Sequence, residues 1–285
     1  MIMSFYNRVI LIGFGKIAQD CLRIIDSQFD GDIHVVEFEK SFFGNTWKNS
    51  ENIIFHQLPE KIDVNNFFLS FSDSTLVVSA NNNFLFPKIL VEIDFFYIIN
   101  FHNSLLPKHK GRNAQSWAIY EQDLETGITW HEVNEKVDAG GILCQKKITL
   151  FGNETALSLT RSLMELGVKG FEEIFLKIIN KNILVLKQNI NQNKVNLSKE
   201  TPNNGALDLN WSFNKIHAFL RSFNYGRINI FPKPTLTLLG KYMIINKYVL
   251  VNETNHTSGL LFKFYDNNKI EVTENQQKLI LHLTS

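Results

Sequence analysis

Short apolar runs alternate with helix-length segments throughout the first half of the sequence. Strands are expected over residues 8–12, 33–38, 53–56, 75–79 and 97–101, and helices over 17–27, 63–71 and the segment that carries Pro87. Strands that feed crossover helices in this order build a parallel sheet covered by helices. We therefore expect an α/β fold with a doubly wound, mostly parallel sheet.

After His102 the pattern shifts towards β-structure. A helix is expected over 114–120, strands over 127–133 and 142–150, and one long amphipathic helix over 154–181. The loop 134–141 between the two strands is long enough to be functional. We expect the catalytic domain to span 1–187 and a polar linker to span 188–206.

The C-terminal region, 207–285, is expected to form a small β-rich domain, either a barrel or a sheet. Its apolar runs cover 236–238, 242–251, 260–264, 269–272 and 278–283. Neither internal repeats nor a low-complexity tail interrupt the sequence.

Charge and cysteine usage limit the classes of partner. The 285 residues include 29 basic and 28 acidic side chains, a formal charge of +1, so no overall basic field favours binding to nucleic acid. Cys21 and Cys144 fit neither a disulfide framework nor a paired metal-ligand spacing. Without an export signal or an apolar run long enough to span a membrane, a cytoplasmic protein is expected.

A glycine-rich turn near the N-terminus offers the first candidate site. Gly13, Gly15 and Ala18 form a G-x-G-x-x-A motif after a strand and at the head of a helix, and Glu37 lies near the end of the next strand. This is the arrangement of a dinucleotide site, and an NAD-dependent oxidoreductase is one hypothesis. The same glycines also suit a tight turn without a ligand. Because no hydride-transfer residues follow, we favour the structural interpretation.

The second candidate site lies at the end of the strand 97–101. Alternate side chains of a strand share a face, so Asn100 and His102 should point the same way at the carboxyl edge of the sheet. Asn100 can donate to an oxyanion, and His102 can donate or accept a proton near neutral pH. Asp138, within the small-residue sequence VDAGG, is the natural acid to orient His102 and raise its pKa.

Ordinary turn chemistry could explain each of these residues alone. Asn100 would cap a turn, His102 would be a satisfied interior histidine, and Asp138 would begin a loop. The combination of Asn-x-His, Ser-Leu-Leu-Pro, a basic loop containing glycine and a later Asp-Ala-Gly is harder to obtain as unrelated turns. Because His102, His109 and His131 lack companion acids and cysteines, no metal site is expected.

The same residues carry a family resemblance. The segments NFHNSLLP (100–107) and GIT (127–129), together with VDAG (137–140), resemble the formyltransferases that act on methionyl-tRNA, glycinamide ribonucleotide and amino sugars. A weaker resemblance resumes at LDLNWSFNKIHAFLRSF (207–223), which is similar to the entry into the small C-terminal domain of family members. The resemblance implies a Rossmann-like core, N10-formyltetrahydrofolate as formyl donor, and Asn100, His102 and Asp138 as catalytic residues.

The resemblance also implies where the ligands bind. The pterin of the folate would lie between Asn83, Phe84 and Leu85 on one side and Val133, Val137 and Asp138 on the other. Candidate acceptor-binding residues are Ser104, Lys108, Arg112, Asn113, Trp117 and Trp130. A solvated basic loop and packed tryptophans would explain several of these residues almost as well.

The acceptor amine is the least determined part of the hypothesis. The sequences GITWHEVNEKVDAG and RSFNYGRINIFPKP look like the formyltransferases of peptide natural-product biosynthesis, which implies a small-molecule or carrier-bound aminoacyl acceptor. A nucleotide-linked amino sugar is the main alternative. Transfer RNA is disfavoured because 207–285 is not strongly basic. A folate- or nucleotide-binding regulator and a homodimeric assembly also stay open.

Overall fold

The computed structural model describes residues 4–37, 43, 47, 52–189, 194–238, 240–265 and 268–284. The chain divides into two compact units. The first unit contains 1–111, 127–148 and 161–195, and the second contains 112–126, 149–160 and 196–285. No helix among the described residues is long and apolar enough to cross a membrane.

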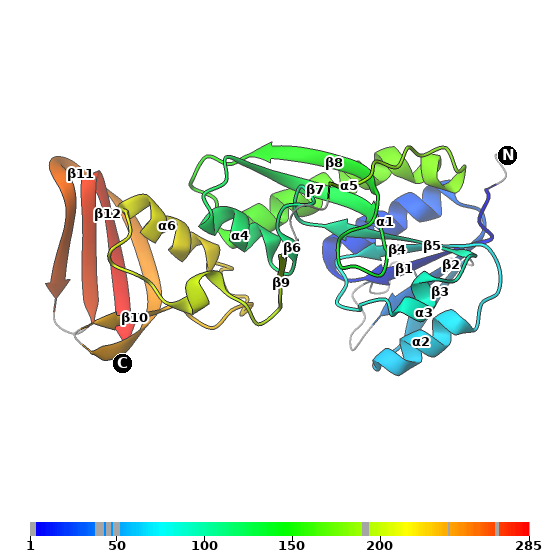
Figure 1. The fold of residues 1–285 in the computed structure, drawn as a ribbon, viewed down its shortest axis with the longest axis horizontal. Coiled ribbons are helices and arrows are strands. Elements are labelled where there is room, and N and C mark those ends of the chain that lie inside the picture. Colours follow the sequence, from blue (N-terminus) through cyan, green and yellow to red (C-terminus); the bar gives the residue numbers. More distant parts are fainter. Residues whose placement is uncertain are drawn as a thin grey trace. The chain divides into compact units, whose positions relative to one another are not determined.

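A seven-stranded sheet with the order β3-β2-β1-β4-β5-β7-β8 forms the centre of the first unit (Figure 1). The strands are β1 (Arg8–Gly13), β2 (Asp32–Glu37), β3 (Ile53–Gln57), β4 (Thr75–Ala80), β5 (Phe96–His102), β7 (Glu125–Glu132) and β8 (Ile142–Thr149). The first five of these strands run parallel to one another, whereas β7 runs antiparallel to β5. The expected doubly wound, mostly parallel sheet is thereby confirmed.

Helices cover both faces of this sheet, which explains why its central strands are apolar at consecutive positions. On one face, α2 (Lys61–Leu69) and α3 (Lys88–Val91) pack through Phe68 and Leu90 into a core cluster with Ile10 and Ile98. On the other face lie α1 (Gly15–Gln28) and α5 (Ala156–Ile179). A Cβ atom on Gly167 of α5 would lie 2.3 Å from the Phe101 ring and 3.0 Å from the Ile17 side chain of α1.

The described part of the second unit contains the start of α5, further helical elements and an antiparallel sheet. Besides α5, these elements are α4 (Ala114–Tyr120), η2 (Pro202–Gly205), α6 (Phe213–Ser222), β10 (Thr235–Leu238), β11 (Lys241–Tyr265) and β12 (Lys269–Thr284). The three strands form one sheet with the order β10-β11-β12. Ile216 and Phe219 of α6 share a buried apolar cluster with Val272 and Leu281 of this sheet. A two-stranded ladder joins β6 (Lys110–Gly111) to β9 (Val195–Asn196).

The C-terminal strands differ from the sequence expectation in length and number. The separate strands expected over 242–251 and 260–264 are parts of one long strand, β11. Its pairing with β12 shifts register between Asn252 and Leu261, where polar residues interrupt the apolar pattern and resemble a turn in the sequence. The described strands form an open three-stranded sheet, not a barrel.

The boundaries of the compact units also differ from the expected division at 187 and 207. The second unit recruits α4 and the start of α5 from the middle of the chain, because α4 packs against α6. A compact unit built from distant segments cannot be recognised from composition. The end of the strand expected to reach Phe38, and part of the connection 188–206, lie outside the described residues.

Candidate active site

The amide of Asn100 is held in one orientation at the carboxyl end of β5. Its Oδ1 accepts a hydrogen bond from the Ser79 hydroxyl at 2.7 Å, and its Nδ2 lies 3.2 Å from Nε2 of His131. Nδ1 of His131 lies 2.7 Å from the Glu132 carbonyl, which can only accept, so Nε2 is free to accept from Asn100. Among the described residues, the second N–H of Asn100 has no partner and can donate to a ligand.

His102 is buried and hydrogen-bonded to the segment that follows β5. Its Nε2 lies 2.9 Å from the carbonyl oxygen of His109, so this nitrogen carries a proton. Nδ1 faces Oδ2 of Asp138 across 3.4 Å. Burial lowers the pKa of His102 below its ordinary value, although the charge of Asp138 opposes this shift. Asp138 raises the pKa of His102 as expected, but burial outweighs the carboxylate and the net shift is downward.

The Asp138 carboxylate lies between two imidazoles and a backbone donor. Oδ2 accepts a hydrogen bond from the Gly111 N–H at 2.7 Å, and Oδ1 lies 3.5 Å from Nε2 of His131. Burial alone would raise the pKa of Asp138, but His102, His131 and the Gly111 N–H together hold it well below the ordinary value. The carboxyl group is therefore ionised, and it stabilises His102 or His131 when either imidazole takes up a proton.

The loop 134–141 is held in place at several points. Asp138 has a left-handed backbone with φ of 50°, and a Cβ atom on Gly140 would lie 1.8 Å from the Glu132 carbonyl oxygen. Nε2 of Gln188 donates to the carbonyl oxygens of Asp138 at 3.1 Å and Gly140 at 2.7 Å. The small residues of VDAGG thus allow the close approach that brings Asp138 to the strand end.

The segments expected to hold a pterin lie beside each other. Phe84 and Val133 belong to one apolar cluster, and Nζ of Lys88 lies 2.9 Å from Oε1 of Glu135. The Phe84 ring is buried in that cluster, so this residue can offer a ligand only its backbone. In contrast, the side chains of Leu85 and Val137 are 67% and 42% exposed.

The backbone next to Asn83 is fixed by a side chain that the sequence did not single out. Oδ1 of Asn82 accepts from the Phe84 N–H at 2.8 Å, and its Nδ2 donates to the Phe84 carbonyl at 3.1 Å. Asn82 therefore stabilises the conformation of the turn that carries Asn83 and Leu85.

Two of the predicted acceptor-binding residues are structural. Trp130 is fully buried, donates its indole N–H to the Gly167 carbonyl at 2.9 Å, and packs against Phe101 and Phe171. Its side chain points to the opposite face of β7 from His131, so the prediction that it lines an acceptor pocket was wrong. The Ser104 hydroxyl is also fully buried and donates to the Lys108 carbonyl.

The remaining acceptor candidates fall in different compact units. Lys108 is exposed in the first unit, whereas Arg112, Asn113 and Trp117 belong to the second. Asn113 precedes α4 with a left-handed backbone, φ of 57°, and Trp117 is buried beside Tyr120. The role of these residues in acceptor binding stays a prediction.

The glycine-rich turn has a structural explanation. A Cβ atom on Gly13 would lie 1.9 Å from the carbonyl oxygen of Ala80, and Gly15 has a left-handed backbone with φ of 76°. Glu37 is buried and accepts the Phe43 N–H at 3.4 Å. Close strand packing thus accounts for the motif without a dinucleotide.

Sequence reasoning missed His131, Ser79 and Gln188. His131 had been considered only as a metal ligand, yet it lies directly opposite Asn100 in the antiparallel pairing of β5 with β7. The alternation of Thr129 and His131 was a usable signal, but the direction of β7 was not. Gln188 lies 50 residues from Asp138 in sequence, and no local pattern connects them.

Comparisons with known proteins agree with this site. The profile of the formyl transferase family matches residues 69–175, which include Asn100, His102 and Asp138. Methionyl-tRNA formyltransferase of Buchnera aphidicola subsp. Schizaphis graminum is 36% identical over 167 residues, 58% of this chain and 51% of the relative. GDP-perosamine N-formyltransferase of Brucella melitensis biotype 1 is 28% identical over 169 residues, 59% of this chain and 63% of the relative. The matches thus span about half to two thirds of these relatives.

The fold extends the likeness over the whole chain. The N-formyltransferase of Helicobacter canadensis, solved in complex with folinic acid and dTDP-3-aminofucose, superposes with a TM-score of 0.74. The superposition covers 98% of this chain and 100% of the solved chain, with 19% sequence identity. At this identity the likeness establishes the fold. The family profile, the curated relatives and this fold together show that the chain is similar to the formyltransferases, over a segment that includes all three candidate catalytic residues.

Proposed function

We propose that the protein transfers a formyl group from N10-formyltetrahydrofolate to a primary amine. The observation that carries this proposal is the cluster of Asn100, His102 and Asp138, held together at the end of β5 by Ser79 and His131. It combines an oriented N–H donor with an ionised carboxylate beside a neutral imidazole. Acyl transfer to an amine requires both functions.

Asn100 would stabilise the oxygen that becomes negative when the amine attacks. Attack forms a bond between the amine nitrogen and the formyl carbon, and the C=O electrons move to oxygen. The unpartnered N–H of Asn100 can donate to that oxygen without reorganisation, since Ser79 and His131 already fix the amide. A preorganised donor of this kind lowers a barrier by about 3–4 kcal/mol.

His102 and Asp138 would handle the proton that the attacking nitrogen releases. Asp138 is ionised and Nδ1 of His102 carries a free lone pair, so the pair can accept this proton. The C–N10 bond then breaks as C=O re-forms, and the proton passes to the departing folate nitrogen. Atoms and charge balance without a metal ion or an oxidant.

The surroundings of the loop 134–141 fit a flat donor ring. The exposed apolar side chains of Leu85 and Val137 lie on the two neighbouring segments that the Lys88–Glu135 ion pair connects. Apolar contacts suit the faces of a pterin, and backbone groups of the Asn82-stabilised turn suit its polar edge. The donor proposal rests on this fit together with the likeness to the formyltransferases.

A nucleotide-linked amino sugar is the acceptor class that we favour. A curated relative is named a GDP-perosamine N-formyltransferase, and the structure similar over the full chain was solved with dTDP-3-aminofucose. The similarity of that structure covers 98% of this chain, whereas the methionyl-tRNA formyltransferase match covers 58% of it. This preference replaces the carrier-bound aminoacyl group as first choice, and the latter remains the second candidate.

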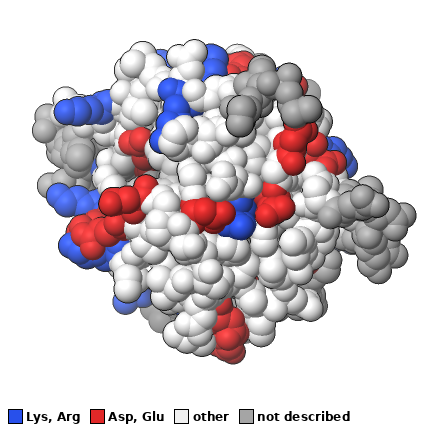
Figure 2. Space-filling view, turned by 90° about the vertical axis from the view of Figure 1, so that its right-hand side faces the viewer, with Lys and Arg blue, Asp and Glu red and all other residues white. Residues whose placement is uncertain are grey.

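Transfer RNA is a weaker candidate on electrostatic grounds. Counterion release from a polyanion needs a concentration of Lys and Arg side chains. The chain has a formal charge of +1. On the face shown in Figure 2, basic and acidic side chains are interspersed and no large patch has a single sign.

The test is formylation of a panel of amines with N10-formyltetrahydrofolate as donor. The panel contains a GDP-linked and a dTDP-linked amino sugar, an aminoacyl carrier protein and methionyl-tRNA, and mass spectrometry detects a gain of one CO. We expect turnover with an amino sugar, and its loss in Asn100→Ala with the fold retained by circular dichroism. Lack of product with every amine would refute formyl transfer, and formylation of the carrier alone would refute the sugar assignment.

A further inference from the structure

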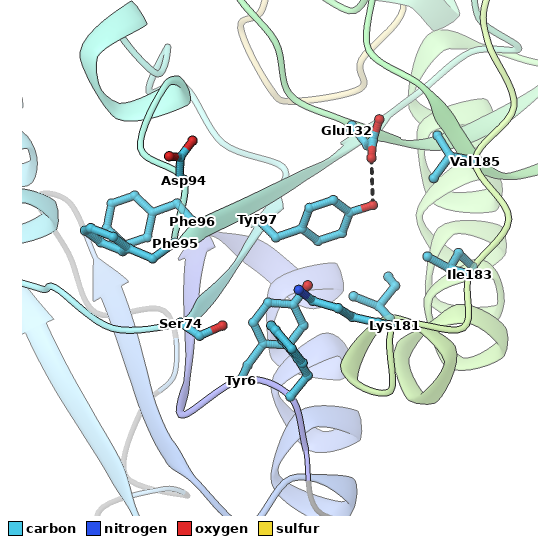
Figure 3. A pocket seen from close by; sticks show the side chains of 12 residues that line it. Tyr6, Ser74, Asp94, Phe95, Phe96, Tyr97, Glu132, Lys181, Ile183 and Val185 are labelled. Atoms are coloured by element: carbon cyan, nitrogen blue, oxygen red, sulfur yellow. Dashed lines mark hydrogen bonds between the residues drawn. The ribbon is translucent and has the colours of Figure 1, made fainter.

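A hollow of about 600 Å³ opens in the first unit, beside the strand β5 but at its amino end (Figure 3). The first residues of β5, the end of β7 and the chain that follows α5 form its walls. Asn100, His102 and Asp138 do not line it. The hollow is therefore separate from the candidate active site.

Aromatic rings form much of the wall. Tyr6 and Tyr97 lie nearly parallel, 18° apart, with ring centroids separated by 6.4 Å, and Phe5 meets Tyr6 edge-on at 5.6 Å. Phe96 also lines the hollow. Aromatic faces carry partial negative charge, which attracts cations at the open side of each ring.

Carboxylates add negative charge to this aromatic lining. Glu132 and Asp94 line the hollow, whereas Lys181 is its single basic residue among those described. Oε1 of Glu132 accepts from the Tyr97 hydroxyl at 2.9 Å (Figure 3), and within the described chain no Lys or Arg nitrogen lies within 4.0 Å of this carboxylate. Burial and the charge of Glu132 raise the pKa of Tyr6 to about 12, so Tyr6 adds no charge.

The positively charged side chain of Lys181 already lies against one of these aromatic rings. Nζ of Lys181 lies 3.1 Å from the centroid of the Phe5 ring. Both residues are exposed, and the long, flexible side chain of Lys181 can move its ammonium group away from the ring into solvent. The ammonium group of Lys181 thus occupies a position that the ammonium group of a ligand could take.

We propose that this hollow is a second binding site, which takes a small organic cation with an ammonium head and an apolar body. The rings of Tyr6, Tyr97 and Phe5 would contact the apolar body and the diffuse positive charge. Glu132 would supply the counter-charge that no basic side chain of the described chain now provides. Lys181 would leave when the ligand binds.

Two walls of the hollow contact the loop 134–141, which carries Asp138. The Glu132 N–H donates to the Gly141 carbonyl at 2.8 Å, and its carbonyl lies 2.7 Å from Nδ1 of His131. On the other wall, a Cβ atom on Gly141 would lie 2.2 Å from the Val185 side chain. Three residues later, Gln188 donates to Asp138 and Gly140. Binding of a ligand in the hollow would therefore change the environment of the loop 134–141, which carries Asp138.

Choline and its neutral isostere 3,3-dimethylbutan-1-ol test the proposal. A quaternary ammonium has no N–H and cannot be formylated, so binding of choline does not depend on the proposed formyl transfer. Isothermal titration calorimetry of the full chain should show saturable binding of choline and binding of the isostere weaker by about tenfold or more. Equal binding of both compounds, or no saturable binding of choline, would overturn the proposal.

Substitutions of acidic and basic residues in the wall should change the affinity for choline in opposite directions. Glu132→Gln, which keeps an acceptor for Tyr97, should weaken choline binding by about tenfold, and Asp94→Asn should weaken it about twofold. Lys181→Met should strengthen binding by about two- to fivefold, because a competing cation is removed. Lys187→Met, an exposed lysine of the same segment outside the hollow, should change nothing. Weaker binding in Lys181→Met would contradict the proposed displacement.

Backbone amide NMR locates the effect. Addition of choline should shift the resonances of Glu132, Gly140 and Gly141, whereas those of Val249 in β11 should stay unchanged. Glu132→Gln should reduce these shifts at the same choline concentration, in line with its weaker binding. Shifts confined to the exposed surface, or equally strong in the second unit, would show that the hollow does not bind the cation or does not couple to the loop.

Discussion

Removal of the Ser79 hydroxyl tests whether the orientation of Asn100 matters for catalysis. Ser79 donates to Oδ1 of Asn100 at 2.7 Å and so distinguishes the two orientations of the amide. A neutral buried hydrogen bond contributes about 0.5–1.5 kcal/mol, so Ser79→Ala should lower kcat by about 2- to 10-fold. Asn100→Ala removes the donor itself and should lower kcat by about 100- to 1,000-fold.

Steady-state kinetics with N10-formyltetrahydrofolate and the amine found active in the panel provide the assay. KM should change little, because Ser79 acts through Asn100 and not on a ligand. Ser79→Ala should have no further effect in the Asn100→Ala background. Ser27→Ala, which removes an exposed hydroxyl from α1, is the matched control. An unchanged kcat in Ser79→Ala would refute the orienting role, and a loss as large as that of Asn100→Ala would mean that Ser79 contacts the substrate.

Three further changes test the loop and the electrostatics of the first unit. Gly140→Ala puts a Cβ atom 1.8 Å from the Glu132 carbonyl oxygen and should destabilise the fold by about 3 kcal/mol in urea melts; an unchanged midpoint would contradict this close approach. Gln188→Leu frees the Asp138 loop and should lower kcat about tenfold with little change in Tm, so full activity would exclude a positioning role. Burial, a neighbouring imidazole and a neighbouring guanidinium lower the pKa of His34 to about 4. The unfolded chain therefore binds a proton there first, and stability present above pH 6.5 should fall by about 1–2 kcal/mol by pH 5. The fall should be smaller in His34→Phe, where the half-buried His56, whose pKa is also lowered by burial, still contributes.

The parallel part of the sheet could be predicted because its strands are buried on both faces. The expected strand 75–79 corresponds to β4, Thr75–Ala80, in which every residue is buried. The shared face of Asn100 and His102 follows from the two-residue period of any strand. The approach of Asp138 could be expected only from its small neighbours, and the structure adds the contacts that hold it.

The features that sequence reasoning missed depend on which strand lies beside which. Trp130 and His131 are adjacent in sequence but point to opposite faces of β7, one into the core and the other to Asn100. Without the antiparallel register of β5 and β7, neither face could be assigned. The direction in which Asp138 shifts the His102 pKa could be predicted, but the larger, opposing effect of burial is a property of the assembled loop and not of the local sequence.

The packing of Gly13 against Ala80 determines where a ligand could reach the first turn. The side of Gly13 that lacks a side chain faces the carbonyl oxygen of the adjacent strand, which would lie 1.9 Å from a Cβ atom. The space opened by the glycine is thus filled by the protein's own backbone, and the carbonyl there would repel a phosphate oxygen. A sequence can therefore contain the glycine motif of a dinucleotide site although the backbone of a neighbouring strand fills the space where the phosphates would bind.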